Sequence, residues 1–231
     1  MTMDRQELAA RFARLDWDDP RSAHRDSRTL LRQLAGDREL LTELVLGIPD
    51  DPLRKKRSEF HPLMDKLCLL EDPEVGYQLR LHDFRVSDLD IVPHDHKYSF
   101  SVYILAGGYT HVWNRRTGGP YDGDFTSKDI TPGIVSLEGP GACYTLQYSL
   151  VHQTVAQPGT VSLFLRGPQR MERWHAAGDM LERLKGYEAP KRDGSPHQGS
   201  TPLSAAGYAQ VRDSLMQRGI ITNRRSIDVV A

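Results

Sequence analysis

The sequence predicts a mainly β protein, a sandwich or barrel, with helices before the sheets and a loop-and-helix tail after them. Three observations predict this. Short runs that alternate apolar and polar residues follow one another between about residues 66 and 170, separated by Gly, Pro or Asp. Apolar residues before them recur at helical spacing, and a Gly-, Pro- and Ser-rich stretch after them precedes a last helical pattern. We therefore expect a helical extension over residues 1–65, a β-barrel over 66–170 and a loop and helix tail over 171–231.

Helices are expected at both ends of the chain. Apolar residues at helical spacing predict one helix over residues 4–16 and a second over 27–47, which Gly36–Asp37 divides in two. The basic LRKKR run at residues 53–57 is short and has few aromatic neighbours, so we expect a solvated face or loop rather than a nucleic-acid patch. In the tail, a short helix is expected at 178–184, a loop at 186–204 and a helix at 205–218 with Gly219 at its C-cap.

The β region contains eight alternating runs. They are residues 77–84, 89–92, 100–105, 109–113, 133–137, 144–148, 152–155 and 160–165. Many short strands with frequent turns favour a closed or two-layered β architecture over a parallel sheet.

Composition narrows the class of protein. The 231 residues include 30 Lys+Arg and 31 Asp+Glu, a net charge of −1, which argues against a dedicated nucleic-acid binder. The N-terminus is charged from its fourth residue and has no apolar core of a secretory signal, and the apolar run over residues 40–48 is too short to span a bilayer. Cys68 and Cys143 are expected to be buried free thiols. We therefore expect a cytoplasmic protein with no membrane or nucleic-acid partner.

The chemistry is expected to centre on histidines. In a strand, residues two apart point to the same face, so His94 and His96 would present both imidazoles to one side. His152 occurs alone in a later strand, and a sheet folded on itself can bring it opposite the pair. Three imidazoles on one side of a divalent metal leave the other coordination positions open, as catalysis requires.

The surrounding residues resemble a known family. HDH followed by Ser101 and Gly108 resembles the first motif of the cupin superfamily, and His152 carries its weaker second motif. HDHKYSFSVYILAGG and LVHQTVAQPGTVSLFLRGPQRMERWHA resemble cysteine dioxygenase, over about residues 77–176. The resemblance implies a cupin jelly-roll barrel, a three-histidine thiol dioxygenase, the metal ligands His94, His96 and His152, and iron(II). Ligand type alone leaves nickel, cobalt and manganese open.

The sequence departs from the family pattern at several positions. The positions of the usual cupin acid hold Phe100 and Ser101, so no carboxylate follows the HxH pair. Ser101 also stands at the position of the family's cross-linking Cys, and Arg166 stands at that of its Tyr. We expect Tyr103 or Tyr148 to replace that tyrosine, with Ser101 beside them as a catalytic residue. In a different cupin register, Glu138 would be a fourth metal ligand.

The electrostatics of three neutral imidazoles favour an anionic ligand. They leave a metal its full 2+ charge, which favours a thiolate or enolate in the open positions. A guanidinium would hold a carboxylate bidentately. Arg80 and Arg166 are the candidates, chosen on strand geometry. His82 and His111 lie in strands that could face the same cavity and are candidates for substrate binding. His82 is otherwise expected to support the ligands or to be a satisfied core histidine, and His111 otherwise to lie at the surface.

The function predicted from the sequence is a mononuclear metal-dependent dioxygenase that oxidises a small thiol amino acid, L-cysteine or a close analogue, with O2. Its product is the sulfinate or a more oxidised compound. A cupin lyase or isomerase that uses the metal as a Lewis acid, and a cupin that only binds a ligand, are the alternatives. The N-terminal helices either form a homodimer or cap the barrel.

Overall fold

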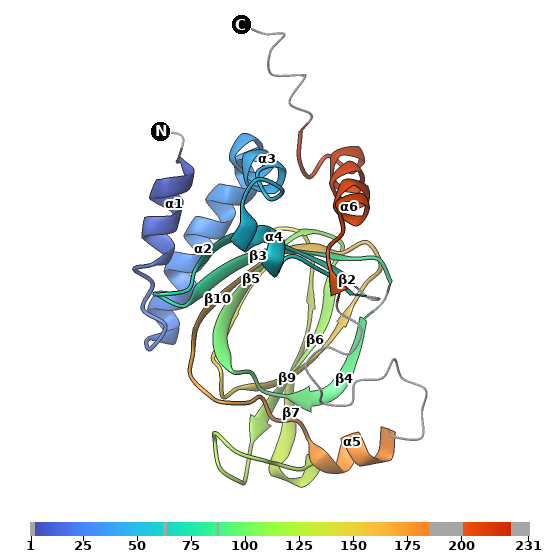
Figure 1. Ribbon diagram of the computed structural model, residues 1–231. Coiled ribbons are helices and arrows are strands. Elements are labelled where there is room, and N and C mark those ends of the chain that lie inside the picture. The colour runs from blue at the N-terminus through green and yellow to red at the C-terminus, as the bar shows by residue number, and fades with distance from the viewer. Residues whose placement is uncertain (1–2, 62–63, 87, 185–200, 223–231) are drawn as a thin grey trace, which may run out of the picture.

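The computed structural model describes residues 3–61, 64–86, 88–184 and 201–222. It is mainly β, with two antiparallel sheets that face each other and helices outside them (Figure 1). The predicted mainly β fold, with helices before and after the sheets, is confirmed. None of the helices in the described ranges combines the length and the apolarity needed to cross a bilayer.

The larger sheet has seven strands. Their order is β11 (Thr201–Pro202), β1 (Glu59–Phe60), β2 (Met64–Asp72), β3 (Tyr77–Phe84), β10 (Val161–Gln169), β5 (Tyr98–Ala106) and β8 (Cys143–Leu146). Strands from both sides of the predicted 66–170 barrel therefore join this sheet, because β1 precedes that range and β11 follows it. The division into three parts stays a prediction.

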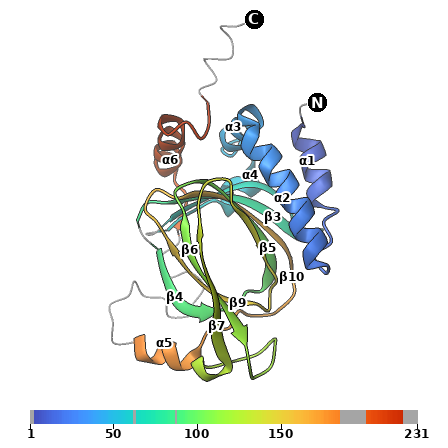
Figure 2. The ribbon, with the colours of Figure 1, turned by 180° about the vertical axis from the view of Figure 1, so that it is seen from behind.

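The smaller sheet has four strands. Their order is β4 (Asp88–His94), β9 (Val151–Ala156), β6 (Tyr109–Arg116) and β7 (Ile130–Glu138), with the short 3-10 helix η1 (Ser127–Asp129) before β7. Figure 2 shows these strands across the barrel from β5 and β10. The turn from β5 to β6 passes through Gly107, whose φ of +71° favours glycine, and an added Cβ there would lie 2.6 Å from the Thr160 Cα.

The helices are α1 (Arg5–Phe12), α2 (Pro20–Gly36), α3 (Arg38–Leu46), α4 (Pro52–Arg57), α5 (Gly178–Leu184) and α6 (Ala205–Gln217). All except α5 lie on the outer side of the seven-stranded sheet (Figure 1). The predicted break between α2 and α3 is confirmed, because the Asp37 carboxylate accepts a hydrogen bond from the Leu40 N–H and starts a new helix. Gly219 follows α6 with a φ of +68°, as expected beyond a helix C-terminus.

Strand β2 and helix α4 are among the elements that were not predicted. The run Leu67–Leu70 in β2 is buried on both faces, so it shows no alternation. The basic run expected as a solvated face or loop forms α4, in which Lys55, Lys56 and Arg57 are exposed but Arg54 is only 3% exposed. Its guanidinium donates to the carbonyl oxygens of Leu44 and Leu69, at 2.8 and 3.1 Å. The expectation of a solvated segment is therefore wrong for Arg54, whose charge joins α3, α4 and β2.

The seven-stranded sheet contributes apolar residues to a core on each of its faces. Its outer face and the helices form one continuous cluster that includes Leu8, Leu31 and Leu41 from the helices and Leu79 and Leu163 from the sheet. Its inner face contributes to a second cluster inside the barrel, where Phe84, Phe100, Val102 and Ile104 pack together. The site described next opens onto this inner cluster.

Candidate metal centre

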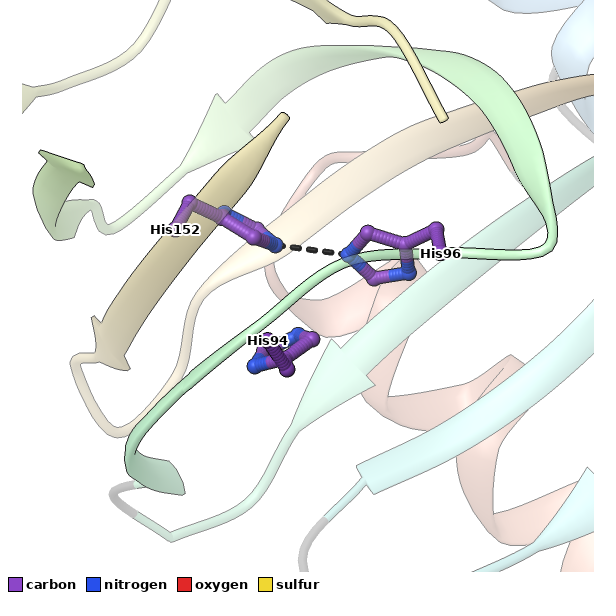
Figure 3. Close-up of side chains that lie close together, drawn as sticks. All are labelled: His94, His96 and His152. Atoms are coloured by element: carbon purple, nitrogen blue, oxygen red, sulfur yellow. Dashed lines mark hydrogen bonds between the residues drawn. The ribbon is translucent and has the colours of Figure 1, made fainter. Parts of the chain in front are cut away.

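Three histidines converge inside the barrel (Figure 3). His94 ends β4 and lies directly opposite His152 of β9, whereas His96 lies in the link between β4 and β5. One ring nitrogen from each lies within 4.8 Å of the other two, and the Nε2 atoms of His96 and His152 are 2.7 Å apart. The structure thus brings the three predicted ligands together, although His96 reaches the site from a link and not through strand alternation.

Backbone carbonyl oxygens hold two of these histidines in place, one through its ring and the other through its backbone N–H. His94 Nδ1 lies 3.0 Å from the Val92 carbonyl oxygen, to which it donates, so its Nε2 keeps the lone pair. The backbone N–H of His96 donates to the carbonyl oxygen of Tyr148 at 3.0 Å, which fixes the link beside the β8–β9 turn. The carbonyl oxygens of Val92 and Tyr148 therefore hold the His94 ring and the His96 backbone in place before any ligand binds.

The imidazoles of His96 and His152 are held in the neutral form. Burial lowers the pKa of His96 and of His152 well below the usual 6.5, and the neighbouring histidines His94 and His111 lower both further. A neutral imidazole carries the lone pair that binds a metal.

The donor set fits a single transition-metal ion. Bonds of about 2.1 Å from one ion to imidazole nitrogens are compatible with ligand atoms as close together as these. Among the described residues, no carboxylate or thiol belongs to the group. Three imidazoles suit iron, nickel, cobalt, copper or zinc better than magnesium or calcium, which prefer oxygen ligands.

A buried ion pair braces the HxH segment. Asp95 is fully buried, and its carboxylate accepts from the Arg116 guanidinium at 2.7 Å and from the His175 backbone N–H at 2.6 Å. His175 Nδ1 lies 3.1 Å from the same carboxylate. Asp95 therefore faces away from the imidazoles on either side of it and ties their segment to β6 and to the chain before α5.

His111 does not face a substrate position. It is fully buried, with Nε2 at 2.7 Å from His152 Nδ1 and Nδ1 at 3.3 Å from the Glu138 carboxylate. Both nitrogens are occupied, so the expectation that His111 binds substrate is corrected, whereas a supporting role fits. Glu138 contacts His111 and lies outside the group of ligand atoms, which removes its predicted alternative role as a fourth ligand.

Ser101 and Tyr103 lie on the wrong face of β5 for catalysis. The Ser101 hydroxyl bonds to Ser27 of α2 at 2.7 Å and to Thr145 at 2.6 Å, on the outer face of the sheet. Tyr103, two residues further along β5, packs against the outer apolar cluster. The predicted catalytic roles of both residues are therefore corrected, since the residues of β5 that face the barrel interior are Phe100 and its alternate neighbours.

Arg80 and His82 lie on the inner face of β3. Arg80 stands directly opposite Phe164 of β10, and the His82 ring stacks on the Phe164 ring at 4.9 Å. Arg80 Nε and His82 Nε2 are buried without a hydrogen-bond partner among the described residues. Burial lowers the pKa of His82 well below 6.5, with Lys66 and Arg80 adding to the effect, so His82 is neutral. Both side chains offer unused polar atoms to the barrel interior.

Arg166 is linked to the imidazoles through Tyr98. Its guanidinium lies 5.0 Å from the centre of the Tyr98 ring, and that ring lies 6.3 Å from the ring of His96. The guanidinium also donates to the Gln78 side-chain oxygen at 3.3 Å and to the Gly76 carbonyl oxygen at 3.4 Å. Arg166 is therefore inside the barrel, as expected, but a tyrosine ring separates it from the nearest imidazole.

Aromatic rings form the wall between the imidazoles and these basic groups. Phe100 lies 4.7 Å from His96 and 4.8 Å from Phe164, measured between ring centres. Sequence reasoning did not single out Tyr98 or Phe100 as part of the site, and their position directly after the HxH pair is the signal that could have placed them here. Tyr148 contributes its carbonyl oxygen to His96, and a role for its phenol stays a prediction.

Comparisons with known proteins were made at the levels of sequence and structure. No protein-family model matches the chain, and no curated protein matches it. Among solved structures, KdgF from Halomonas sp. is similar, with a TM-score of 0.35 and 17% identity over 47% of this chain and 83% of that chain.

Two further solved structures show the same extent of similarity. Hydroxypropylphosphonic acid epoxidase from S. wedmorenis has a TM-score of 0.34 and 15% identity, over 46% of this chain and 51% of that chain. An RmlC-like cupin from Shewanella frigidimarina has a TM-score of 0.34 and 15% identity, over 46% of this chain and 78% of that chain. Each likeness covers less than half of this chain, and the site is therefore interpreted from its own geometry.

Proposed function

We propose that this protein is a mononuclear metal-dependent oxygenase that oxidises a small thiol amino acid, L-cysteine or a close analogue, with O2. One observation carries the proposal. His94, His96 and His152 converge, and among the described residues no carboxylate shares their group. A divalent ion in this set keeps its full charge, which favours an anionic sulfur ligand over a neutral one.

Iron(II) is the metal of this proposal, with nickel, cobalt and manganese as the alternatives that metal analysis separates. When bound, it would supply Lewis acidity that favours the thiolate form of the substrate, together with redox chemistry toward O2. The simplest balanced reaction adds both atoms of O2 to the sulfur and yields a sulfinate. Further oxidation or decarboxylation is the alternative outcome.

The protein's own residues would bind and orient the substrate. Phe100, Phe164 and Tyr98 present apolar surface beside the imidazoles, which excludes water from the reacting sulfur. Arg166 and Arg80 supply positive charge behind this wall and would hold a carboxylate. Because the Tyr98 ring stands between Arg166 and His96, the arrangement favours a substrate whose acidic group lies further from sulfur than it does in cysteine.

The test combines metal analysis with O2 consumption over a panel of thiols of increasing length. We expect one equivalent of metal in the purified protein and consumption of one O2 per thiol. His96→Ala and His152→Ala should each abolish bound metal. His24→Ala is the matched control, because His24 bonds to Thr145 on the outer side of the sheet, and this variant should keep the metal.

Three outcomes would contradict the proposal. Full metal occupancy in His152→Ala would remove the ligand assignment. Product formation without O2 would indicate a lyase or isomerase instead. Stabilisation by a ligand without any product would indicate a binding protein.

A further inference from the structure

A chain of polar side chains runs from the candidate metal centre behind His152 to the half-buried Glu138. His152 Nδ1 lies 2.7 Å from His111 Nε2, and His111 Nδ1 lies 3.3 and 3.4 Å from the two carboxylate oxygens of Glu138. His111 is fully buried and His152 is 4% exposed. The chain therefore joins a carboxylate to a candidate metal ligand through one intervening imidazole.

The carboxylate determines the direction of each hydrogen bond. An ionised carboxylate only accepts, so His111 Nδ1 carries the proton and donates to Glu138. His111 Nε2 then has the lone pair and accepts from His152 Nδ1–H. His152 Nε2 is left with a lone pair, and this is the atom that lies 2.7 Å from His96 Nε2. A single charge on Glu138 thus selects the metal-binding tautomer of His152.

Neighbouring side chains hold this chain in place. Ser136 Oγ donates to Glu138 Oε1 at 2.9 Å, and the Trp113 indole N–H donates to Ser136 Oγ at 3.1 Å. The His111 ring stacks on the Trp113 ring at 3.9 Å, and the Tyr144 ring meets it edge-on at 4.8 Å. With both nitrogens bonded and its ring packed, His111 has one orientation available.

We propose that His111 and Glu138 are positioning residues that hold His152 in its metal-binding form. The inference rests on the metal site of the proposed function. It adds that a carboxylate acts on the candidate ligand His152 through the imidazole of His111, and not as a ligand itself. Groups that orient a ligand in this way typically contribute 10- to 100-fold to metal affinity.

The test is a competition titration of the full-length protein with cobalt(II) against a chelator, together with the visible absorption spectrum of bound cobalt. Glu138→Gln keeps the shape of the side chain and removes its charge. His111→Phe keeps a ring for Trp113 to stack on and removes both hydrogen bonds. We expect each single variant to weaken cobalt binding by about 10- to 100-fold and to change the spectrum.

The double variant separates a relay from two independent effects. Because Glu138 acts only through His111, the double variant should bind cobalt as weakly as His111→Phe alone. Ser162→Ala, which removes a buried hydroxyl bonded to Tyr109 elsewhere in the barrel, should leave cobalt affinity unchanged and is the control for general effects on the fold.

The outcomes distinguish this inference from the proposed function. Tight cobalt binding by the wild type with unchanged affinity in both single variants would overturn the relay and leave the metal site standing. Additive losses in the double variant would also overturn it, since Glu138 would then act without His111. Failure of the wild-type protein to bind cobalt, iron or nickel would overturn the metal site and the relay together.

Discussion

At the scale of single residues, the proposed binding of the substrate's acidic group depends on the position of a buried arginine. Arg166 is half-buried, and burial lowers its pKa from the usual value, yet its contacts are a side-chain amide, a backbone carbonyl and the face of Tyr98. None of these contacts is a carboxylate. A guanidinium that is desolvated and contacts only neutral groups is a strong binding position for an anion.

Replacing Arg166 therefore tests whether it binds the substrate. We expect Arg166→Ala to lower kcat/KM for the best thiol by an amount that corresponds to a loss of about 2–4 kcal/mol of transition-state stabilisation. The reason is that the acidic group of the substrate loses a charged partner. Steady-state O2 consumption over a range of substrate concentrations measures the effect.

Ser101→Ala is the control for the Arg166 variant. Ser101 bonds to Ser27 and Thr145 beneath α2, so its loss should cost about 1–3 kcal/mol of unfolding free energy and leave kcat/KM unchanged. Unchanged kinetics in Arg166→Ala would remove Arg166 from substrate binding. A large kinetic effect of Ser101→Ala would show that the outer face of β5 matters for catalysis.

At the scale of elements, strands β2 and β3 place two buried carboxylates side by side. Asp65 and Asp83 are directly opposite each other, and each pairs with its own arginine, Arg85 at 3.1 Å and Arg218 at 2.8 Å. Arg218 caps α6, so one of these pairs fixes the C-terminal helix to the sheet. Burial raises the pKa of Asp65 to about 6, with Asp83 adding to the rise and Arg85 opposing it.

This raised pKa predicts a pH dependence of stability. In the unfolded chain Asp65 has the usual pKa of 3.8, so between about pH 4 and pH 6 the folded protein binds the extra proton. Wild-type stability relative to Asp65→Asn should therefore fall as pH rises through this window, by about 1–3 kcal/mol after allowing for solvent near Arg85. Urea unfolding of both proteins from pH 4 to pH 7 measures it. A difference that stays constant over this range would contradict the assignment.

Alternation in the sequence located these elements but did not show which face of each strand points into the barrel. Both faces of β5 are buried, the outer one under α2 and the inner one among aromatic rings, so Ser101 and Phe100 look equally suited to a site. The three histidines could be predicted because an HxH pair and a third histidine in a later strand are residue types that bind metals, at a spacing that lets them converge. The role of His111 behind His152 was not predictable, because it depends on the pairing of β6 with β9.

At the scale of the whole molecule, the N-terminal helices, the outer face of the large sheet and α6 share one apolar cluster. Leu31 of α2, Leu81 of β3 and Leu215 of α6 belong to it, and each is fully buried. The predicted helical extension, barrel and tail thus bury their apolar surface against one another. Segments that share a core unfold together when the loss of one exposes the others.

Leu215→Ala tests this coupling from the C-terminal end of the chain. Removal of a fully buried leucine should cost about 2–5 kcal/mol of unfolding free energy. Because the cluster is continuous, circular dichroism and tryptophan fluorescence should follow one transition shifted to lower urea, while cobalt affinity stays at the wild-type value. Gln217→Ala, an exposed change in the same helix, should change the unfolding free energy by less than about 0.5 kcal/mol. An early, separate transition that involves only part of the helical signal would show instead that α6 unfolds independently, and that the barrel keeps its site without the tail.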